Sequence, residues 1–255
     1  MSFNQELEVA LEAARQAGEI ALRLQAGIEA TEKADLSPVT IADKESEKCI
    51  SQILSDAFPH DGLLGEEGSN RAPLNGRRWI IDPIDGTRDY VRGNPFWATL
   101  IGLEVDGDVA VGVASFPGLG RVYTATRGGG AFCNREPIRA SQKTSLSQAV
   151  VCVNGLNKLN GVAYRERLLD WVSQAWAVRA FGGAPDSMMV ASGQADIWLE
   201  PVAAAWDLAP LKIILEESGA KFFNLDGGKS IYGGNCLACA PGLVGELRKF
   251  AGVPE

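Results

Sequence analysis

The sequence predicts a protein of mixed α and β structure, with an α+β N-terminal half and an α/β C-terminal half. Three observations lead to this prediction. Residues 5–57 show helical periodicity, residues 77–134 show apolar runs typical of strands, and from Ser147 onward strands and helices alternate. The polar run Arg139–Gln148 separates the last two regions. We therefore expect an N-terminal part, residues 1–145, and a C-terminal part, residues 146–255.

Two helices are expected at the N-terminal end. Over residues 5–27, apolar and small residues recur at spacings of three and four, which marks one face of a helix. The stretch Thr31–Thr40 is polar and contains a proline, so it is expected to be a loop. Thr40 and Asp43 fit a capping box, and a second helix should run from there to about Ala57.

The middle of the chain is expected to be rich in strands. Residues 77–82 form a short buried run, and residues 96–117 contain two apolar runs joined at Asp106-Gly107-Asp108, a strong hairpin signal. The pattern continues through residues 121–134. The Gly128-Gly129-Gly130 run within it lacks GxGxxG spacing and no helical pattern follows, so a tight β-turn is expected rather than a phosphate loop.

The C-terminal region alternates between the two kinds of element, as in an α/β unit. The expected strands are residues 149–153, 177–181, 195–200 and 221–224, and the expected helices are about 164–177, 186–192, 207–218 and 242–250.

Composition narrows the class of protein. The chain has 255 residues, of which 46% are hydrophobic and 22% charged, as in ordinary soluble globular proteins. No apolar run reaches membrane-spanning length, and the acidic, amphipathic N-terminus is typical of neither a signal nor a transit peptide. The five cysteines are then expected to be reduced thiols in a cytoplasm. A net charge of −8 without a basic block disfavours nucleic acid as a partner, and an anionic substrate would need a cation beside it.

The run WIIDPIDGTRDYV places Asp82 and Asp85 three residues apart. In a continuous strand this odd separation sends the two side chains to opposite faces, and Pro83 would break the interior of a helix. The two carboxylates converge only if the chain turns sharply at Pro83 and Ile84. On this segment alone, an acidic hairpin turn and a pair of metal-binding carboxylates remain equally open.

Other acidic residues bear on that choice. Glu66 and Glu67 lie between glycines after an apolar strand end, and Asp207 stands at the expected N-cap of a helix. Taken singly, Asp207 and Asp43 are more typical of helix caps, and Glu66 is more typical of a solvated loop. Taken together, hard oxygen ligands of this kind suit Mg²⁺ or Mn²⁺.

Other catalytic chemistries have little support in the sequence. His60 is the one histidine and lies in a polar loop, so we expect it at the surface. Cys236 and Cys239 have CxxC spacing, but no second pair exists and their run is apolar, which predicts core packing rather than zinc binding. A GxSxG motif is absent, so a serine hydrolase is not indicated.

Three short segments follow one another along the chain. They are Glu66-Glu67 after a glycine, DPIDGT at Asp82–Thr87, and WD with LAP at Trp206–Pro210. They resemble the signatures of the inositol monophosphatase family, which are lithium-sensitive, Mg²⁺-dependent phosphatases. Lys33–Asp43 resembles the family's N-terminal loop, and the resemblance covers nearly the whole chain. It implies a layered αβαβα sandwich of the inositol monophosphatase and fructose-1,6-bisphosphatase type, with the site where the halves meet. It also implies a homodimer.

The resemblance implies roles for the metal ligands. Two or three Mg²⁺ ions, or Mn²⁺ as a substitute, would be held by four carboxylates and one backbone carbonyl. Asp85 would bridge two of the ions. The ligands are Glu66, Asp82, Asp85, Asp207 and the carbonyl of Ile84.

The resemblance also implies a catalytic set. Asp43 and Thr87 would orient the attacking water for in-line displacement, and Glu67 would support the metal ligands from behind. Gly86 and Thr87 would offer backbone N–H groups to the phosphate. Asp85 and Asp207 are expected to border the bound substrate as well.

The pocket residues suggest a substrate. The run Arg88–Leu103 resembles the histidinol-phosphate phosphatases of this superfamily, which predicts hydrolysis of histidinol phosphate in histidine biosynthesis. Glu200 and Asp89 would suit the ammonium and imidazole of that substrate. Arg179 and Arg92 are further pocket candidates. Inositol monophosphate is the second choice. Fructose 1,6-bisphosphate, bisphosphonucleotides and a catalytically silent role rank lower.

Overall fold

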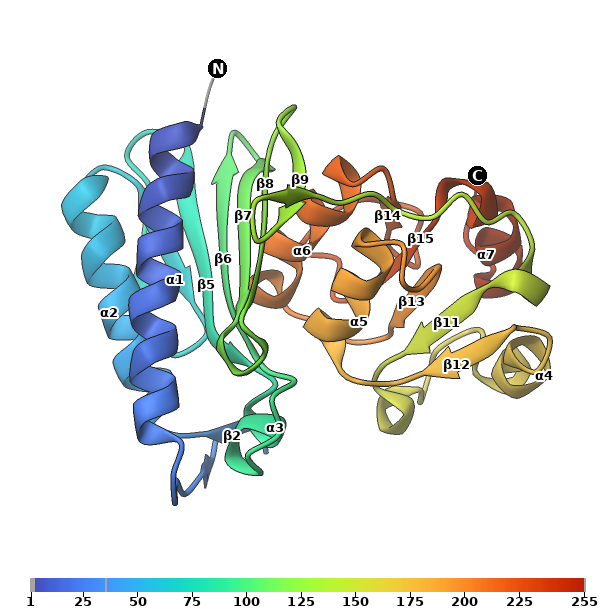
Figure 1. Ribbon diagram of the computed structural model, residues 1–255, viewed down its shortest axis with the longest axis horizontal. Helices are drawn as coiled ribbons and strands as arrows, with labels where there is room; N and C mark the ends of the chain where they lie inside the picture. The colour runs from blue at the N-terminus through green and yellow to red at the C-terminus, as the bar shows by residue number, and fades with distance from the viewer. Residues whose placement is uncertain (1–2, 35, 255) are drawn as a thin grey trace.

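The chain folds into five layers in a computed structural model that describes residues 3–34 and 36–254 (Figure 1). An outer pair of helices lies beside an eight-stranded sheet, two helices separate this sheet from a five-stranded sheet, and further helices cover the far side. The αβαβα sandwich is confirmed. The helices of its layers are α1 (Asn4–Leu24), α2 (Ile41–Ala57), α4 (Leu168–Val172), α5 (Gly183–Ala191), α6 (Ala205–Glu217) and α7 (Val244–Ala251), and the short helix α3 (Thr87–Val91) follows strand β5 (Arg77–Asp85).

The N-terminal helices follow the local sequence signals. α1 ends three residues before the expected end, and its buried face consists of alanines and one glycine, which lets it pack closely on α2 and the sheet. The Thr40 hydroxyl accepts hydrogen bonds from the N–H groups of Ala42 and Asp43, while the Asp43 carboxylate accepts from the N–H of Thr40. The predicted capping box is therefore confirmed. Two short strands, β1 (Thr31–Glu32) and β2 (Pro38–Val39), pair within the expected loop.

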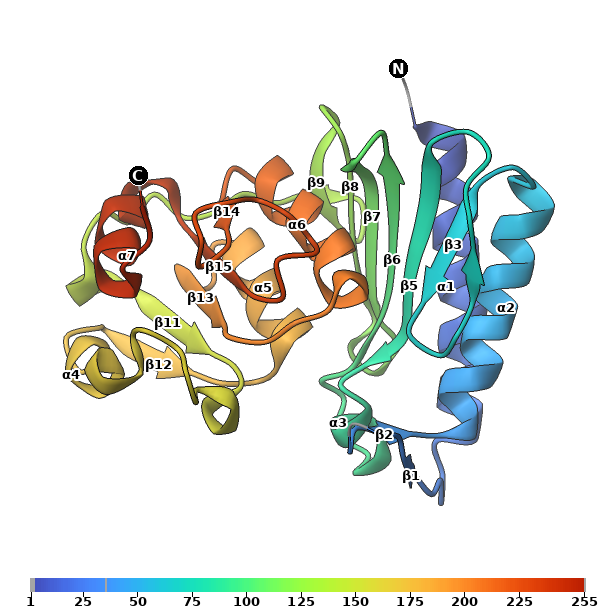
Figure 2. The same ribbon diagram turned by 180° about the vertical axis from the view of Figure 1, so that it is seen from behind.

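The eight-stranded sheet has the order β10-β9-β8-β7-β6-β5-β3-β4. All its strand pairs are antiparallel except β3 with β5, which lie side by side near α2 (Figure 2). The strands are β3 (Gly62–Gly65), β4 (Asn70–Arg71), β5 (Arg77–Asp85), β6 (Ala98–Val105), β7 (Asp108–Phe116), β8 (Arg121–Thr126), β9 (Gly130–Cys133) and β10 (Glu136–Pro137).

Two turns in this sheet match the sequence predictions. The hairpin between β6 and β7 turns at Asp106 and Gly107, both with positive φ, as a tight two-residue turn requires. Gly128 and Gly129 lie in the connection between β8 and β9, which begins at Gly130, and the N–H groups of Gly128 and Gly130 donate to the carboxylate of Glu217. The chain's own carboxylate thus occupies these donors, which agrees with a structural turn.

Helix α6 lies unusually close to the eight-stranded sheet because two glycines face it. Gly102 on β6 and Gly112 on β7 are cross-strand partners. A Cβ on Gly102 would stand 2.8 Å from the Cβ of Ala209, and one on Gly112 would stand 2.5 Å from Cγ2 of Ile213. No side chain fits between helix and sheet here, so these contacts fix the height of α6 above the strands.

The five-stranded sheet has the order β12-β11-β13-β15-β14. β11 is parallel to β12 and β13, and β15 is antiparallel to β13 and β14. The strands are β11 (Val150–Val153), β12 (Ala177–Arg179), β13 (Ile197–Glu200), β14 (Lys221–Phe223) and β15 (Cys236–Cys239).

The predicted helix at 164–177 is too long. Only α4 is α-helical there, because the N–H groups of Trp176 and Ala177 both donate to the carbonyl of Ala149 and lead the chain into β12. Helix α5 starts three residues earlier than predicted. Pro185 is tolerated in its first turn, where backbone N–H groups need no helical partner.

The fold also bears on the predictions for the cysteines, the histidine, membrane-spanning segments and the division of the chain. Cys236 and Cys239 are fully buried in β15, and His60 is exposed, as expected. Within the described residues, no helix has the length and apolar character needed to cross a membrane. The first sheet ends at Pro137 and the second begins at Val150. The division at 145/146 stays a prediction, since α6 from the second part packs on the first sheet.

Candidate active site

Asp82 and Asp85 converge through a bulge in β5. Between these two residues the pairing of β5 with β6 slips by one residue, so Pro83 and Ile84 both lie opposite a single residue, Thr99. The Thr99 hydroxyl donates to the Pro83 carbonyl at 2.9 Å, and the Ile84 N–H donates to Oδ1 of Asp82 at 3.0 Å. The expected sharp turn at Pro83-Ile84 is wrong, and so is the hairpin alternative. An extra residue in a continuing strand restores both carboxylates to one face.

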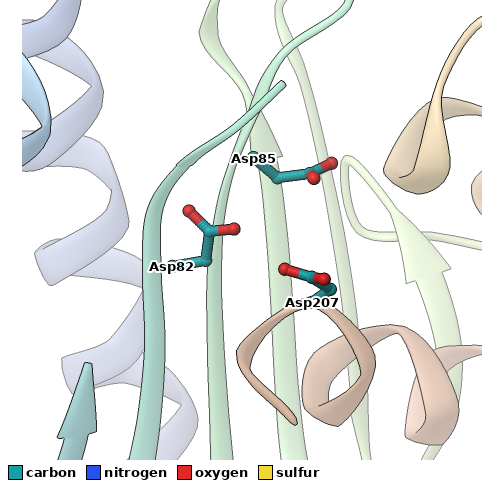
Figure 3. Close-up of side chains that lie close together, drawn as sticks. All are labelled: Asp82, Asp85 and Asp207. Atoms are coloured by element: carbon teal, nitrogen blue, oxygen red, sulfur yellow. The ribbon is translucent and has the colours of Figure 1, made fainter. Parts of the chain in front are cut away.

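Asp207 completes a cluster of three carboxylates (Figure 3). One oxygen from each of Asp82, Asp85 and Asp207 lies within 4.8 Å of the other two. The expected N-cap position for Asp207 is wrong, because Ala204 is the N-cap and Asp207 is the third residue of α6. From there, Oδ2 of Asp207 accepts from the N–H of Ala204 at 2.8 Å. Asp207 thus caps the helix from inside its first turn and still reaches the cluster.

The cluster carries more negative charge than its surroundings can stabilise. Burial, and then repulsion by Glu66, Asp85 and Asp207, raise the pKa of Asp82 well above its usual range. Burial and the charge of Asp207 raise the pKa of Asp85 to about 7. Burial likewise raises the pKa of Asp207 to about 6. A bound cation would relieve this repulsion, and carboxylate oxygens are the ligands that hard divalent cations prefer. The donor set therefore fits Mg²⁺ or Mn²⁺.

Glu66 and Glu67 follow the end of β3 and share one counter-ion. Nζ of Lys33 lies 2.7 Å from Oε1 of Glu66 and 2.5 Å from Oε1 of Glu67. Burial alone would lower the pKa of Lys33, but the two carboxylates raise it overall. In the protein without metal, an ammonium group thus partly neutralises Glu66, whose carboxylate also repels Asp82.

Thr87 and Asp43 form a second group beside the cluster. Thr87 is the first residue of the short helix α3 (Thr87–Val91), and its hydroxyl can donate to the Ile84 carbonyl at 3.1 Å or to Oδ1 of Asp43 at 3.3 Å. The other Asp43 oxygen accepts from both the N–H and the hydroxyl of Thr40. Burial raises the pKa of Asp43. Asp43 therefore lies behind Thr87 with one oxygen directed at it.

One cavity of about 450 Å³ joins most of the predicted residues. It lies between the N-terminal sheet and the C-terminal elements, where the resemblance implied the site. The sequence-predicted residues that line it are Glu66, Asp82, Ile84, Asp85, Gly86, Thr87, Asp89, Glu200 and Asp207.

Glu200 ends β13 on the wall of this cavity. Its Oε2 accepts a hydrogen bond of 2.6 Å from Nδ2 of Asn154, and only 4% of Glu200 is exposed. Burial raises the pKa of Glu200 to about 8, against the opposing effect of Asn154. Gly183, the first residue of α5, leaves room for this carboxylate, because a Cβ there would lie 3.3 Å from Oε2.

Some predicted residues lie elsewhere. Arg179 is exposed, donates to the neighbouring carbonyl of Val178, and does not line the cavity. Arg92, at the end of α3, does not line it either, and Glu67 faces Lys33 rather than the aspartates. Their roles in the site stay predictions. Asp43 does not line the cavity but contacts it through Thr87.

Sequence reasoning missed several polar residues of the wall, among them Asn154 and Lys158. Both lie in a segment after β11 where nothing in the local pattern separates a pocket residue from an ordinary loop residue. Lys158 is close enough to lower the pKa of Glu200 and of Asp207. Only the tertiary structure shows that the Lys158 ammonium lies near the carboxylates of Glu200 and Asp207.

Comparison with known proteins gives consistent matches. A sequence model described as the inositol monophosphatase family matches residues 4–250. A histidinol-phosphatase from Chlorobaculum parvum is 38% identical over 94% of this chain and 93% of its own. An inositol-1-monophosphatase from Rhizobium meliloti is 34% identical over 79% of this chain and 77% of its own. Among solved structures, the extragenic suppressor protein suhB from Bartonella henselae has a TM-score of 0.91 at 29% identity, covering 97% of this chain and 98% of its own.

Proposed function

Because the chain belongs to the inositol monophosphatase family, we propose that it is a Mg²⁺-dependent phosphatase whose substrate is histidinol phosphate, in histidine biosynthesis. Its broader activity is that of a phosphoric monoester hydrolase. The observation that carries the metal dependence is the cluster of three aspartates that line the cavity. The observation that favours histidinol phosphate is the similarity to a histidinol-phosphatase along nearly the entire chain.

The proposed metal ligands are four carboxylates, three of which form the aspartate cluster, and one backbone carbonyl. Two or three Mg²⁺ ions would be held by Glu66, Asp82, Asp85, Asp207 and the carbonyl of Ile84. When bound, such ions neutralise the phosphate, lower the pKa of a coordinated water and stabilise the leaving alkoxide. Mn²⁺ has the same ligand preference and is expected to substitute.

Thr87 and Asp43 would orient the attacking water. The Thr87 hydroxyl has one proton, which it can donate to Oδ1 of Asp43, and its lone pairs then remain to accept a hydrogen bond from a water in the cavity. Asp43 holds that hydroxyl in a fixed direction, since its other oxygen is already bound by Thr40. Glu67 would keep the Lys33 ammonium beside the site when Glu66 binds a cation.

Gly86 and Thr87 would bind the phosphate through their backbone N–H groups. Gly86 has a φ of 85°, and a Cβ there would stand 3.1 Å from the carbonyl of Phe96, so only glycine suits this position. Asp85 and Asp207 line the same cavity and would border the bound phosphate.

Glu200 and Asp89 would recognise the alcohol. Histidinol phosphate carries an ammonium beside the ester carbon and an imidazole farther away, and both carboxylates line the same cavity. Burial raises the pKa of Glu200, but an ammonium beside it would favour its ionised form, and opposite charges across such a contact favour the matching substrate over a neutral polyol. Arg179 is exposed and does not line the cavity, so a contact with the substrate would require its side chain to reorient.

A panel of phosphate esters tests this proposal. Phosphate release would be measured with Mg²⁺ and with EDTA for histidinol phosphate, myo-inositol 1-phosphate, fructose 1,6-bisphosphate and adenosine 3′,5′-bisphosphate. We expect the highest kcat/KM for histidinol phosphate and none in EDTA. A clearly higher value for inositol 1-phosphate would establish the alternative, which the similarity to the Rhizobium meliloti protein supports. No hydrolysis of any ester would indicate a catalytically silent member.

The bisphosphates are expected to be poor substrates. A second phosphate needs additional cationic groups, and the described residues that line the cavity include only two basic side chains, Arg88 and Lys158. Lys158 lies near Glu200 and Asp207, whose charges it partly balances.

We also propose a cytoplasmic location, where the five free cysteines would stay reduced.

We further propose a homodimer formed at the free edge of the five-stranded sheet. Strand β12 is paired on one side only, and apolar side chains are exposed beside it: 72% for Trp176, 41% for Val178 and 79% for Leu169. Light scattering after size exclusion should give twice the chain mass, and Trp176→Glu should give the monomer. A monomeric wild type would remove this part of the proposal.

A further inference from the structure

A buried glutamate on α2 holds the loop that carries Glu66. Only 3% of Glu47 is exposed. Its Oε2 accepts from the N–H of Glu67 at 2.7 Å, and its Oε1 accepts from the N–H of Ser69 at 2.8 Å. One turn along the same helix, the hydroxyls of Ser51 and Ser69 lie 2.8 Å apart. The loop after β3 is thus tied to α2 at three points.

The position of this carboxylate depends on a glycine. A Cβ on Gly65 would stand 2.5 Å from Oε2 of Glu47, a distance that no real contact allows. Gly65 immediately precedes Glu66, whose own N–H donates to the Ile81 carbonyl at 3.1 Å. The backbone around Glu66 is therefore held by two contacts. The N–H of Glu66 is bound to strand β5, and the N–H of the next residue is bound to Glu47.

Glu47 itself touches neither the cavity nor the aspartates. It is absent from the cavity wall and faces the loop from behind. Four residues before it on α2 lies Asp43, which contacts Thr87, so two acidic residues on one helix face support the site from behind. Hydrogen bonds from N–H groups to an ionised carboxylate are about twice as strong as neutral ones. Glu47 is thus well suited to hold a loop in one conformation.

We propose that Glu47 is a positioning residue for the metal centre, acting through the loop that presents Glu66. It sets the affinity of the centre for divalent cations while binding neither cation nor substrate. The inference rests on the proposed function in one respect, the role of Glu66 as a metal ligand. Partners that orient a ligand typically change metal affinity by about 10–100-fold when they are removed.

The test is Mn²⁺ binding to the full chain without substrate, followed by the electron paramagnetic resonance signal of free Mn²⁺. Glu47→Gln keeps the size of the side chain but turns an amide N–H₂ toward a backbone N–H, so one contact is lost. We expect the Kd for Mn²⁺ to rise at least about 10-fold. Glu45→Gln removes one charge from an exposed position of the same helix, and its Kd should stay within about twofold of the wild type.

A double-mutant cycle separates positioning from general loss of structure. If Glu47 acts through Glu66, then Glu47→Gln should change the Kd by less than about twofold in a Glu66→Gln background. An undiminished 10-fold effect in that background would overturn the proposal. Gly65→Ala serves as a second variant if Glu47→Gln does not fold, because it leaves the carboxylate no room while keeping its charge. Unchanged Mn²⁺ affinity in Gly65→Ala would count against the proposal equally.

The outcomes distinguish this inference from the proposed function. Mn²⁺ affinity that responds as expected, in a protein that hydrolyses no phosphate ester, supports the inference and removes the proposed function. Hydrolysis of histidinol phosphate by the wild type, with Mn²⁺ affinity unchanged in Glu47→Gln, does the reverse. If Glu66→Gln binds Mn²⁺ as tightly as the wild type, Glu66 is not a ligand and the inference fails.

Discussion

Replacing Asp82 by asparagine should have opposite effects on activity and on stability. Asp82→Asn keeps the shape of the side chain, and its carbonyl oxygen can still accept from the Ile84 N–H that supports the bulge. It removes one negative charge from a cluster in which burial, Glu66 and the other aspartates already raise the pKa of Asp82 well above its usual range. We therefore expect turnover to be lost while the metal-free protein becomes more stable.

The size of the gain follows from the geometry. Two unit charges less than 4.8 Å apart repel by at least about 3 kcal/mol at an effective dielectric constant of about 20, and Asp82 belongs to two such pairs. The folded protein can avoid this repulsion by keeping Asp82 protonated. At pH 8 the solution lies about four pH units above the pKa of an unfolded aspartate, and protonation costs about 1.4 kcal/mol for each of these units. The repulsion between the charges and the cost of protonation therefore each destabilise the folded protein by about 6 kcal/mol.

Screening and relaxation reduce the measurable part to about 3 kcal/mol. For a chain of this size, this amounts to a rise in Tm of roughly 5–10 °C. The assay is thermal unfolding at pH 8 in EDTA, followed by circular dichroism, together with phosphate release in Mg²⁺. We expect kcat to fall at least about 100-fold. Asp170→Asn, which changes the same charge at an exposed position, should move Tm by less than about 2 °C.

Two results would refute this reasoning. A Tm several degrees below that of the wild type in EDTA would mean that the Asp82 carboxylate supports the bulge rather than straining the fold. Turnover close to that of the wild type would mean that Asp82 is not a metal ligand.

Three further predictions concern the same site. In EDTA, Asp85 and Asp207, with pKa values of about 7 and 6, hold protons at pH 5 that the unfolded chain has largely released. Stability should therefore fall as the pH rises from 5 to 8, and a Tm series with saturating Mg²⁺ should lose this slope. Glu200→Gln should raise KM for histidinol phosphate about 10-fold while Mn²⁺ affinity stays within about threefold, and equal loss of both would remove its role in substrate recognition. Gly112→Ala should lower stability by about 2 kcal/mol and weaken Mn²⁺ binding, because the added Cβ would displace α6 and Asp207. Wild-type values for unfolding by urea and for Mn²⁺ binding would show that α6 can move without disturbing the cluster.

The features that the sequence predicted well depend on neighbouring residues. Thr40 and Asp43 form their capping box within one helical turn, and Asp106-Gly107 forms its turn within two residues. Such contacts involve few competing partners, so residue type and spacing are enough to predict them. The helix expected at 164–177 was too long because its end is set by hydrogen bonds to Ala149, which lies far back in the sequence.

The identities of the candidate metal ligands were also accessible from the sequence, through motifs whose order and spacing resemble a family. Their geometry was not. Asp82 and Asp85 share a face because β5 pairs with β6 through a bulge, which a strand pattern cannot indicate without its partner. Asp207 reaches them because two glycines on β6 and β7 admit α6 against the sheet.

The sequence by itself thus determined most of the longer elements, the family that the chain resembles and the candidate residues that carry charge into the site. The tertiary structure alone decided how those charges meet. It placed Glu47 behind the loop of Glu66, Asn154 against Glu200, and Lys158 near both Glu200 and Asp207. The physical reason is that each of these interactions joins residues at least about twenty positions apart or on different elements. Burial and repulsion then depend on the packing of the whole chain rather than on any local pattern.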